Sequence, residues 1–272
     1  MKLRQTLVVA ACLVIGVILW FLPRTALSAK TESTQSAQNT SDVNEQVELL
    51  KKELSATDLS KLESLEQELK KASGPNEKMQ WYDSLSKYWD RQMRPGIASE
   101  YVYFMAATGN QSGDWLKAGK RFLGLANFFS PEERSMLLTR AVECLEKAYA
   151  ADSLNPEIQT DLGIAYTQSG NNPMKGISLL KEVSEKDPEN FDAQFNLGVF
   201  SMQSGQYGKA AERFRTALQL RADLHGIRLY LSDALAGAGQ KEEARKELNE
   251  LKKLTQDTSL IGEANRRLQQ LH

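Results

Sequence analysis

The stretch Phe191–Leu224 reads FDAQFNLGVFSMQSGQYGKAAERFRTALQLRADL, and the rest of the chain repeats its pattern. It holds two short helical patterns that are joined at residues 204–206, where Ser-Gly-Gln indicates a turn. In the second pattern Ala210, Phe214 and Ala217 recur at i, i+4 and i+7, which is one face of a helix. The stretch therefore predicts a helical hairpin.

Small residues predict where the two helices of this hairpin cross. Gly198 and Ala210 would allow a close approach, while Leu197 and Phe214 would fill the space on either side. Together with Ala217, these residues stand at the spacing of the tetratricopeptide repeat, a helix–turn–helix unit of about 34 residues, which the stretch resembles.

The same period recurs along the chain. Trp81 and Trp115 are 34 residues apart, and so are Tyr88 and Phe122. About ten extra residues fall within Phe128–Thr139, where a Ser-Pro-Glu-Glu sequence is expected to cap a lengthened helix. The predicted units and the final amphipathic cap cover residues 78–111, 112–154, 155–190, 191–224, 225–257 and 258–272.

The predicted fold class is all-α. We expect a tetratricopeptide superhelical solenoid of about five helix–turn–helix repeats with a C-terminal capping helix, behind an N-terminal membrane segment. The predicted parts are a signal anchor or signal peptide, a flexible polar linker, an N-terminal helical region and the solenoid, at residues 1–28, 29–42, 43–74 and 75–272. In the helical region, Ser55–Asp58 offers N-cap residues for a second helix.

The N-terminus has the pattern of a segment directed to a membrane. Lys2 and Arg4 precede the uncharged apolar run Leu7–Leu22. Its 16 residues lie between the length of a signal-peptide core and that of a full membrane span. Both an uncleaved anchor and cleavage after Ser28 remain open, and in either case the chain beyond Pro23 is translocated.

Composition excludes several classes of function. The formal net charge of −1 over 272 residues argues against a nucleic-acid surface. Cys144 is expected to be a small core residue. The two histidines, His225 and His272, stand in no metal-binding or nucleophile motif. We therefore expect no enzyme activity, no cofactor, no metal and no small-molecule substrate.

Resemblance to the repeat family implies protein binding along the concave surface that the first helices form. Carried over by position, the partner-binding groove is Tyr82, Trp89, Leu116, Lys120, Leu123, Thr160, Ile164, Thr167, Phe195, Val199, Met202, Leu229 and Asp233. The lysines and arginine with which some family members clamp a terminal carboxylate are not at the matching positions here. For Phe195, Val199 and Met202, burial in a core is the alternative.

Together, the anchor, the linker and the solenoid resemble a membrane-tethered tetratricopeptide scaffold of a Gram-negative envelope, a single-pass inner-membrane protein whose repeats lie in the periplasm. The expected partner is a protein of unknown identity. The alternatives are an assembly factor for envelope proteins, as in c-type cytochrome maturation, and a non-catalytic subunit of an envelope enzyme.

The N-terminal pattern generates a prediction of topology. Because Lys2 and Arg4 hold the start of the chain in the cytoplasm, a reporter enzyme fused after His272 should be active only in the translocated compartment. Cytoplasmic activity would contradict the assignment. Sequencing of the mature N-terminus separates the two alternatives, since cleavage after Ser28 would leave Ala29 first.

Overall fold

The computed structural model describes residues 43–271. The predicted membrane segment Leu7–Leu22 and the linker lie outside the described residues. Within residues 43–271, no helix combines the length and the apolarity needed to cross a membrane. The chain divides into two compact units, Met1–Ser64 and Leu65–His272, and each is considered by itself.

In the first unit, the described residues form a helix over residues 43–51 and the first part of α3 (Ala56–Lys71). Ser55 caps α3, because its Oγ accepts a hydrogen bond from the backbone N–H of Asp58 at 3.1 Å. This is the helix start that the sequence indicated.

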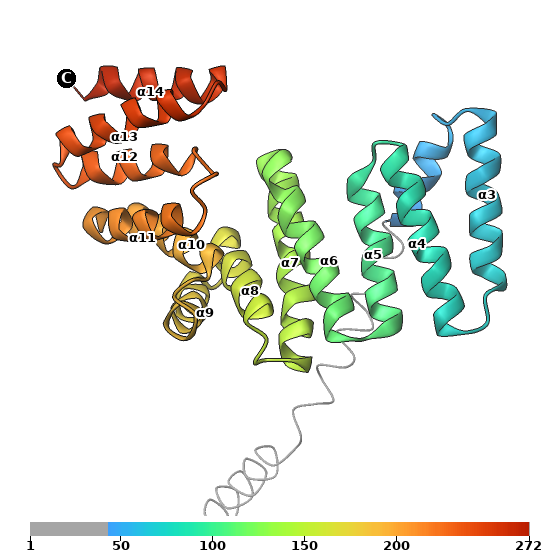
Figure 1. Cartoon of the computed structure of the whole chain (residues 1–272). Helices are drawn as coiled ribbons and strands as arrows, with labels where there is room; N and C mark the ends of the chain where they lie inside the picture. The colour runs from blue at the N-terminus through green and yellow to red at the C-terminus, as the bar shows by residue number, and fades with distance from the viewer. Residues whose placement is uncertain (1–42, 272) are drawn as a thin grey trace, which may run out of the picture. The chain divides into compact units, whose positions relative to one another are not determined.

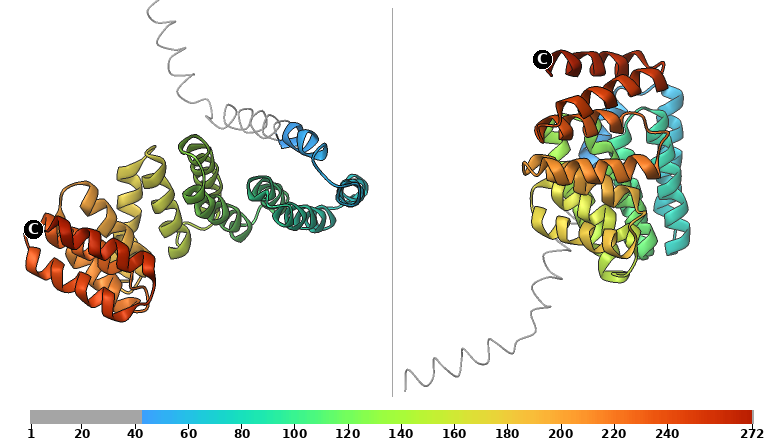
Figure 2. Two further views of the ribbon diagram at one scale, coloured as in Figure 1. Left: turned by 90° about the horizontal axis from the view of Figure 1, so that it is seen from above. Right: turned by 60° about the vertical axis from the view of Figure 1, so that its left-hand side comes forward.

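The second unit is a row of helical hairpins, and its described part holds no strand. Each hairpin pairs two consecutive helices, which Figures 1 and 2 show side by side in chain order. The pairs are α4 (Pro75–Arg91) with α5 (Pro95–Gly109), α6 (Ser112–Leu125) with α7 (Pro131–Ala151), α8 (Pro156–Ser169) with α9 (Pro173–Lys186), α10 (Phe191–Gln203) with α11 (Tyr207–Leu220) and α12 (Ile227–Gly237) with α13 (Lys241–Leu254), followed by α14 (Thr258–Gln270).

A glycine on the first helix and a large side chain on the second make the closest contact in three of these hairpins. A Cβ atom added to the glycine would lie 2.5–2.8 Å from that side chain, which is too close. The pairs are Gly119 with Leu145, Gly163 with Leu180 and Gly198 with Phe214. In the fifth hairpin Ser232 stands 34 residues beyond Gly198 and is buried, with its hydroxyl donating to the carbonyl oxygen of Leu229 at 2.8 Å.

The turns inside the hairpins need a left-handed residue. Gly170, Gly205 and Gly239 provide it in the third, fourth and fifth hairpins, with φ of 71°, 71° and 80°. In the first hairpin the same place is taken by Met93, whose φ is 56° and whose side chain is 83% exposed. Left-handed backbone strains a residue with a Cβ atom, so Met93 is the one poorly suited residue among these turns.

The second hairpin contains the predicted insertion. A short 3-10 helix, η1 (Ala126–Phe128), follows α6, and α7 runs for 21 residues. Ser130 and Glu133 form a reciprocal capping box at the start of α7, as the sequence indicated. Gly119 meets a residue 26 positions further along the chain, whereas Gly198 meets one 16 positions further. The difference is the ten-residue insertion.

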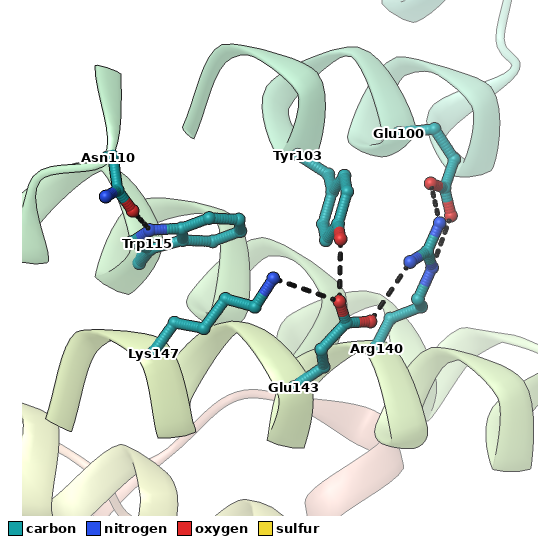
Figure 3. A network of polar contacts seen from close by, with 7 residues as sticks. All are labelled: Glu100, Tyr103, Asn110, Trp115, Arg140, Glu143 and Lys147. Atoms are coloured by element: carbon teal, nitrogen blue, oxygen red, sulfur yellow. Dashed lines mark hydrogen bonds and ion pairs between the residues drawn. The ribbon is translucent and has the colours of Figure 1, made fainter. Parts of the chain in front are cut away.

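A polar network joins α5 to α7 where the first and second hairpins meet (Figure 3). Arg140 pairs with Glu100 on α5 and with Glu143 on α7, and its guanidinium lies 4.4 Å from the centre of the Tyr103 ring. Tyr103 donates to Glu143 at 2.6 Å, and Lys147 lies 3.4 Å from the same carboxylate. Because most of these groups are shielded from water, removal of one partner would leave a buried charge unpaired.

Two hydrophobic clusters make up much of the core of the second unit, and α10 contributes to both. Ala193 and Leu197 belong to the first cluster, which extends back to Val102 and includes the buried thiol Cys144. Phe195 and its neighbours on the other side of α10 pack against the second cluster, which runs from Ala210 to Leu271. Helix α10 therefore connects two cores.

Helix α14 covers the end of the second cluster, as expected of a cap. Ala264 is fully buried, and the flanking leucines of α14 pack against the same cluster. Arg267 is paired with Asp233 of α12 at 2.8 Å, and Arg245 of α13 donates to the carbonyl oxygen of Leu271 at 2.7 Å. Polar contacts thus fix α14 to both helices of the last hairpin.

The close crossings predict opposite effects for two glycine-to-alanine changes. Gly198→Ala should lower the free energy of unfolding by about 1–3 kcal/mol, because the new Cβ would meet the Phe214 ring at 2.7 Å. Gly208→Ala, at the start of α11, has open space and should be neutral or raise stability by about 0.5 kcal/mol. Urea unfolding of the full chain in detergent, followed by circular dichroism, compares them. Equal stability of the two variants would contradict the crossing.

The left-handed turn at Met93 generates a second stability prediction. Met93→Gly should raise the free energy of unfolding by about 1 kcal/mol, since it relieves the backbone strain while little packing is lost. Met136, which is also exposed but lies inside α7, is the matched control. Met136→Gly should lower stability by about 1 kcal/mol in the same urea titration. A loss of stability in Met93→Gly would show that the turn is not strained.

Candidate functional site

The first helices of four consecutive hairpins form one wall of a groove of about 770 Å³. Helices α6, α8, α10 and α12 each contribute side chains, and the turn before α12 and helix α14 close one end. The lining residues are Lys120, Leu123, Gly124, Asn127, Asp161, Ile164, Gln168, Phe191, Asp192, Phe195, Asn196, Asp223, Leu224, His225, Gly226, Ile227, Tyr230, Thr255 and Leu260.

One side of the groove is aromatic. Phe191 and Phe195 stack with their ring centres 5.9 Å apart, and the ring of Tyr230 meets Phe195 edge-on at 5.1 Å. Phe214, which is fully buried, supports both Phe195 and Tyr230 from behind at 5.7 Å. Since Tyr230 keeps 47% of its surface exposed, this aromatic wall offers apolar area to a ligand.

Helix α8 contributes polar atoms that lack partners. Asp161, Ile164 and Gln168 lie at i, i+3 and i+7, so they share one face of α8. Asp161 Oδ2 and Gln168 Oε1 are shielded from water, and neither has a hydrogen-bond partner among the described residues. The Nδ1 atom of His225, which lines the same groove, is also buried and unpartnered. Buried polar atoms are normally hydrogen-bonded, so each of these three takes its partner from water or from a ligand.

The charge of Asp161 depends on its burial. Burial raises the pKa of its carboxyl to about 6. The like charges of Glu157 and Asp192 also raise this pKa, whereas the positive charge of Lys120 lowers it. The Nζ atom of Lys120 lies 3.9 Å from Asp161 Oδ2 but makes its hydrogen bond to Glu157. Asp161 is therefore only partly compensated by the protein.

Four of the thirteen predicted groove residues line this groove: Lys120, Leu123, Ile164 and Phe195. Three others are buried and do not line it. Trp89 is 0% exposed, Thr160 is 3% exposed and donates to the carbonyl oxygen of Pro156, and Leu229 is 8% exposed. Their assignment to an exposed groove is therefore corrected, because they form part of the helix packing.

The remaining six lie beside the groove or away from it. Tyr82 packs against Tyr101 and Phe104, and Leu116 packs against the first core cluster. Val199 and Met202 pack against the second cluster, Asp233 is paired with Arg267, and the Thr167 hydroxyl donates to the carbonyl oxygen of Gly163 at 2.8 Å. For Phe195 both interpretations hold, since its ring lines the groove and also packs against the second core.

A second hollow, of about 590 Å³, lies between the hairpins α8/α9 and α10/α11. It contains Thr167, the exposed Met174 and three cationic side chains, Lys181, Lys209 and Arg213. Arg213 already donates to Gln194 at 2.6 Å. None of its lining residues has a buried polar atom without a partner, so this hollow is the weaker candidate. Among the described residues, no group of three His, Cys, Asp or Glu side chains could hold a metal ion.

Comparison with protein families identifies the repeats. Residues 169–225 and residues 201–268 match two family models of the tetratricopeptide repeat. No curated protein matches the chain.

Solved structures share the fold. They include a MamA protein, with 20% identity and a TM-score of 0.51 over 65% of this chain and 91% of that one. MamA from Desulfovibrio magneticus has 18% identity and a TM-score of 0.53, with coverage of 66% and 98%. TTC0263, a thermophilic TPR protein from Thermus thermophilus, has 17% identity and a TM-score of 0.53, with coverage of 70% and 98%. Residues 169–268 are therefore tetratricopeptide repeats, and the chain shares the fold of tetratricopeptide repeat proteins.

Proposed function

We propose that this protein is a non-catalytic interaction scaffold that holds a segment of a partner protein in the groove of α6, α8, α10 and α12. Proteins of this repeat family are generally interaction scaffolds. The observation that carries the proposal is the groove itself, which combines aromatic side chains with unpartnered polar atoms on neighbouring first helices. Binding sites commonly combine apolar area with a few placed polar groups.

The extent of the groove supports a peptide-like ligand. Its lining comes from four successive first helices and from α14, so it runs across several hairpins. An extended chain, which spans about 3.3 Å per residue, can follow such a groove from one helix to the next. A compact small molecule would contact only part of it.

We further propose that the scaffold is tethered to a membrane, with its repeats in the periplasm. This part rests on the sequence alone, on the basic start and the apolar run Leu7–Leu22, which lie outside the described residues. The polar linker, residues 29–42, would then let the repeats reach partners near that membrane.

The proposal predicts that peptides selected from a random library on the full chain will bind through the aromatic wall. Tyr230→Ser should weaken their binding by roughly tenfold or more, because an exposed aromatic anchor is lost, while stability changes little. Phe195→Ala should weaken binding too and also lower the melting temperature, because its ring packs on the second core. Fluorescence polarisation gives the affinities, and circular dichroism gives the melting temperatures.

Leu154→Ser is the matched control, since Leu154 is 81% exposed and does not line the groove. It should leave peptide binding unchanged. Failure to select any peptide, or selected peptides that bind Tyr230→Ser as well as they bind the unaltered chain, would refute the groove as the binding site.

A further inference from the structure

The groove has an excess of negative charge. Its lining includes the carboxylates of Asp161, Asp192 and Asp223 but only one lysine, Lys120. That lysine is held by a hydrogen bond to Glu157, which adds another carboxylate beside the groove. Asp223 is paired with Arg221 through two hydrogen bonds of 3.0 Å, so the negative field at the groove entrance comes mainly from the exposed Asp192. This field attracts positively charged ligands.

The unpartnered polar atoms of α8 require hydrogen-bond donors. Asp161 Oδ2 and Gln168 Oε1 can only accept hydrogen bonds, apart from a protonated carboxyl group. They are seven residues apart on α8, or about 10 Å at 1.5 Å per residue, which is the span of about three residues of an extended chain. Ile164 lies between them on the same face and also lines the groove.

We propose that the groove selects an extended basic segment of a partner protein, in which a lysine or arginine donates to the Asp161 carboxylate and a neighbouring apolar side chain packs against Phe195 and Tyr230. The proposal rests on the proposed function and names the class of its partner. Gln168 then accepts from a further donor of the segment, such as a backbone N–H or a second cationic side chain.

A cation matches this site better than a neutral donor does. A partly buried carboxylate with one oxygen that lacks a hydrogen bond loses its hydration when a ligand covers it. A hydrogen bond from a charged donor offsets the free energy that this dehydration costs. The side chain of Asp161 is 14% exposed, so a lysine or arginine can reach it from the groove while its own charge stays near the acidic rim. An acidic segment would instead meet the like charges of Asp161 and Asp192.

Binding should depend on pH. The charged groups that face Asp161 are Lys120 from α6, Glu157 from its own helix and Asp192 from α10, while His225 lines the groove from the turn before α12. Burial raises the pKa of Asp161 to about 6, so its carboxylate is ionised at pH 7.5 and increasingly protonated below about pH 6. A basic segment should therefore bind more weakly as the pH falls through this range.

Three synthetic peptides test the selection. They have about ten residues and the same leucines, and they differ only at the charged positions, which hold lysine, glutamine or glutamate. With the full chain in neutral detergent at pH 7.5, fluorescence polarisation should rank them lysine above glutamine above glutamate. The preference for lysine should shrink at pH 5, and it should still do so in a His225→Gln variant.

Asp161→Asn separates recognition from folding. It should weaken the lysine peptide by roughly tenfold to a hundredfold and change the glutamine peptide little, because a charged hydrogen bond is lost. Its melting temperature at pH 7.5 should stay equal or rise, since the buried carboxylate is ionised there against the effect of burial. Glu185→Gln removes the same charge from α9, outside the groove, and should leave the peptide ranking unchanged.

The outcomes distinguish this inference from the proposed function. If none of the peptides and no library peptide binds, the proposed function itself fails. If library peptides bind through Tyr230 but carry no excess of lysine or arginine, or if Asp161→Asn leaves the lysine peptide unaffected, only the basic partner is excluded. Self-association of the chain that Tyr230→Ser abolishes, without peptide binding, would assign the groove to a second copy and overturn the proposal.

Discussion

The arrangement of the helices depends on one repeated contact. In this contact, a glycine of the first helix of a hairpin meets a large side chain of the second helix. Gly119, Gly163 and Gly198 bring α6, α8 and α10 against the second helices of their hairpins. Because this contact fixes how each first helix is rotated about its axis, it also fixes which residues remain outside the hairpin. The groove is lined by those outward faces. Close packing within each hairpin therefore determines which side chains line the groove.

Features that depend on neighbouring residues were predictable from the sequence. The hairpin around Phe214, the capping box at Ser130 and the terminal cap at Ala264 follow from local spacing and capping chemistry. The groove was predicted only in part, because the positions carried over from the family found Ile164 on α8 but not its neighbours Asp161 and Gln168. Thr160 was expected outside, whereas Asp161, about 100° further around the helix, lines the groove.

Long-range pairing accounts for the other differences. Asp233 was expected to be available to a partner, but it pairs with Arg267, which comes 34 residues later. The burial of Trp89 likewise depends on residues that no local pattern around it specifies. A sequence signal for Asp161 was missed. Asp161 comes three residues before Ile164 and seven before Gln168, so the three side chains form a row on one helix face.

The division of the core at α10 has a consequence for cooperativity. Lys120, Leu123 and Ile164 lie on helices of the first core, whereas Ile227 and Tyr230 lie on a helix of the second, and all five line one groove. A segment bound as proposed would span both cores, and its binding free energy would be lost whichever core opens first. Such a ligand would couple the two cores thermodynamically, because it would make local opening on either side of α10 less favourable.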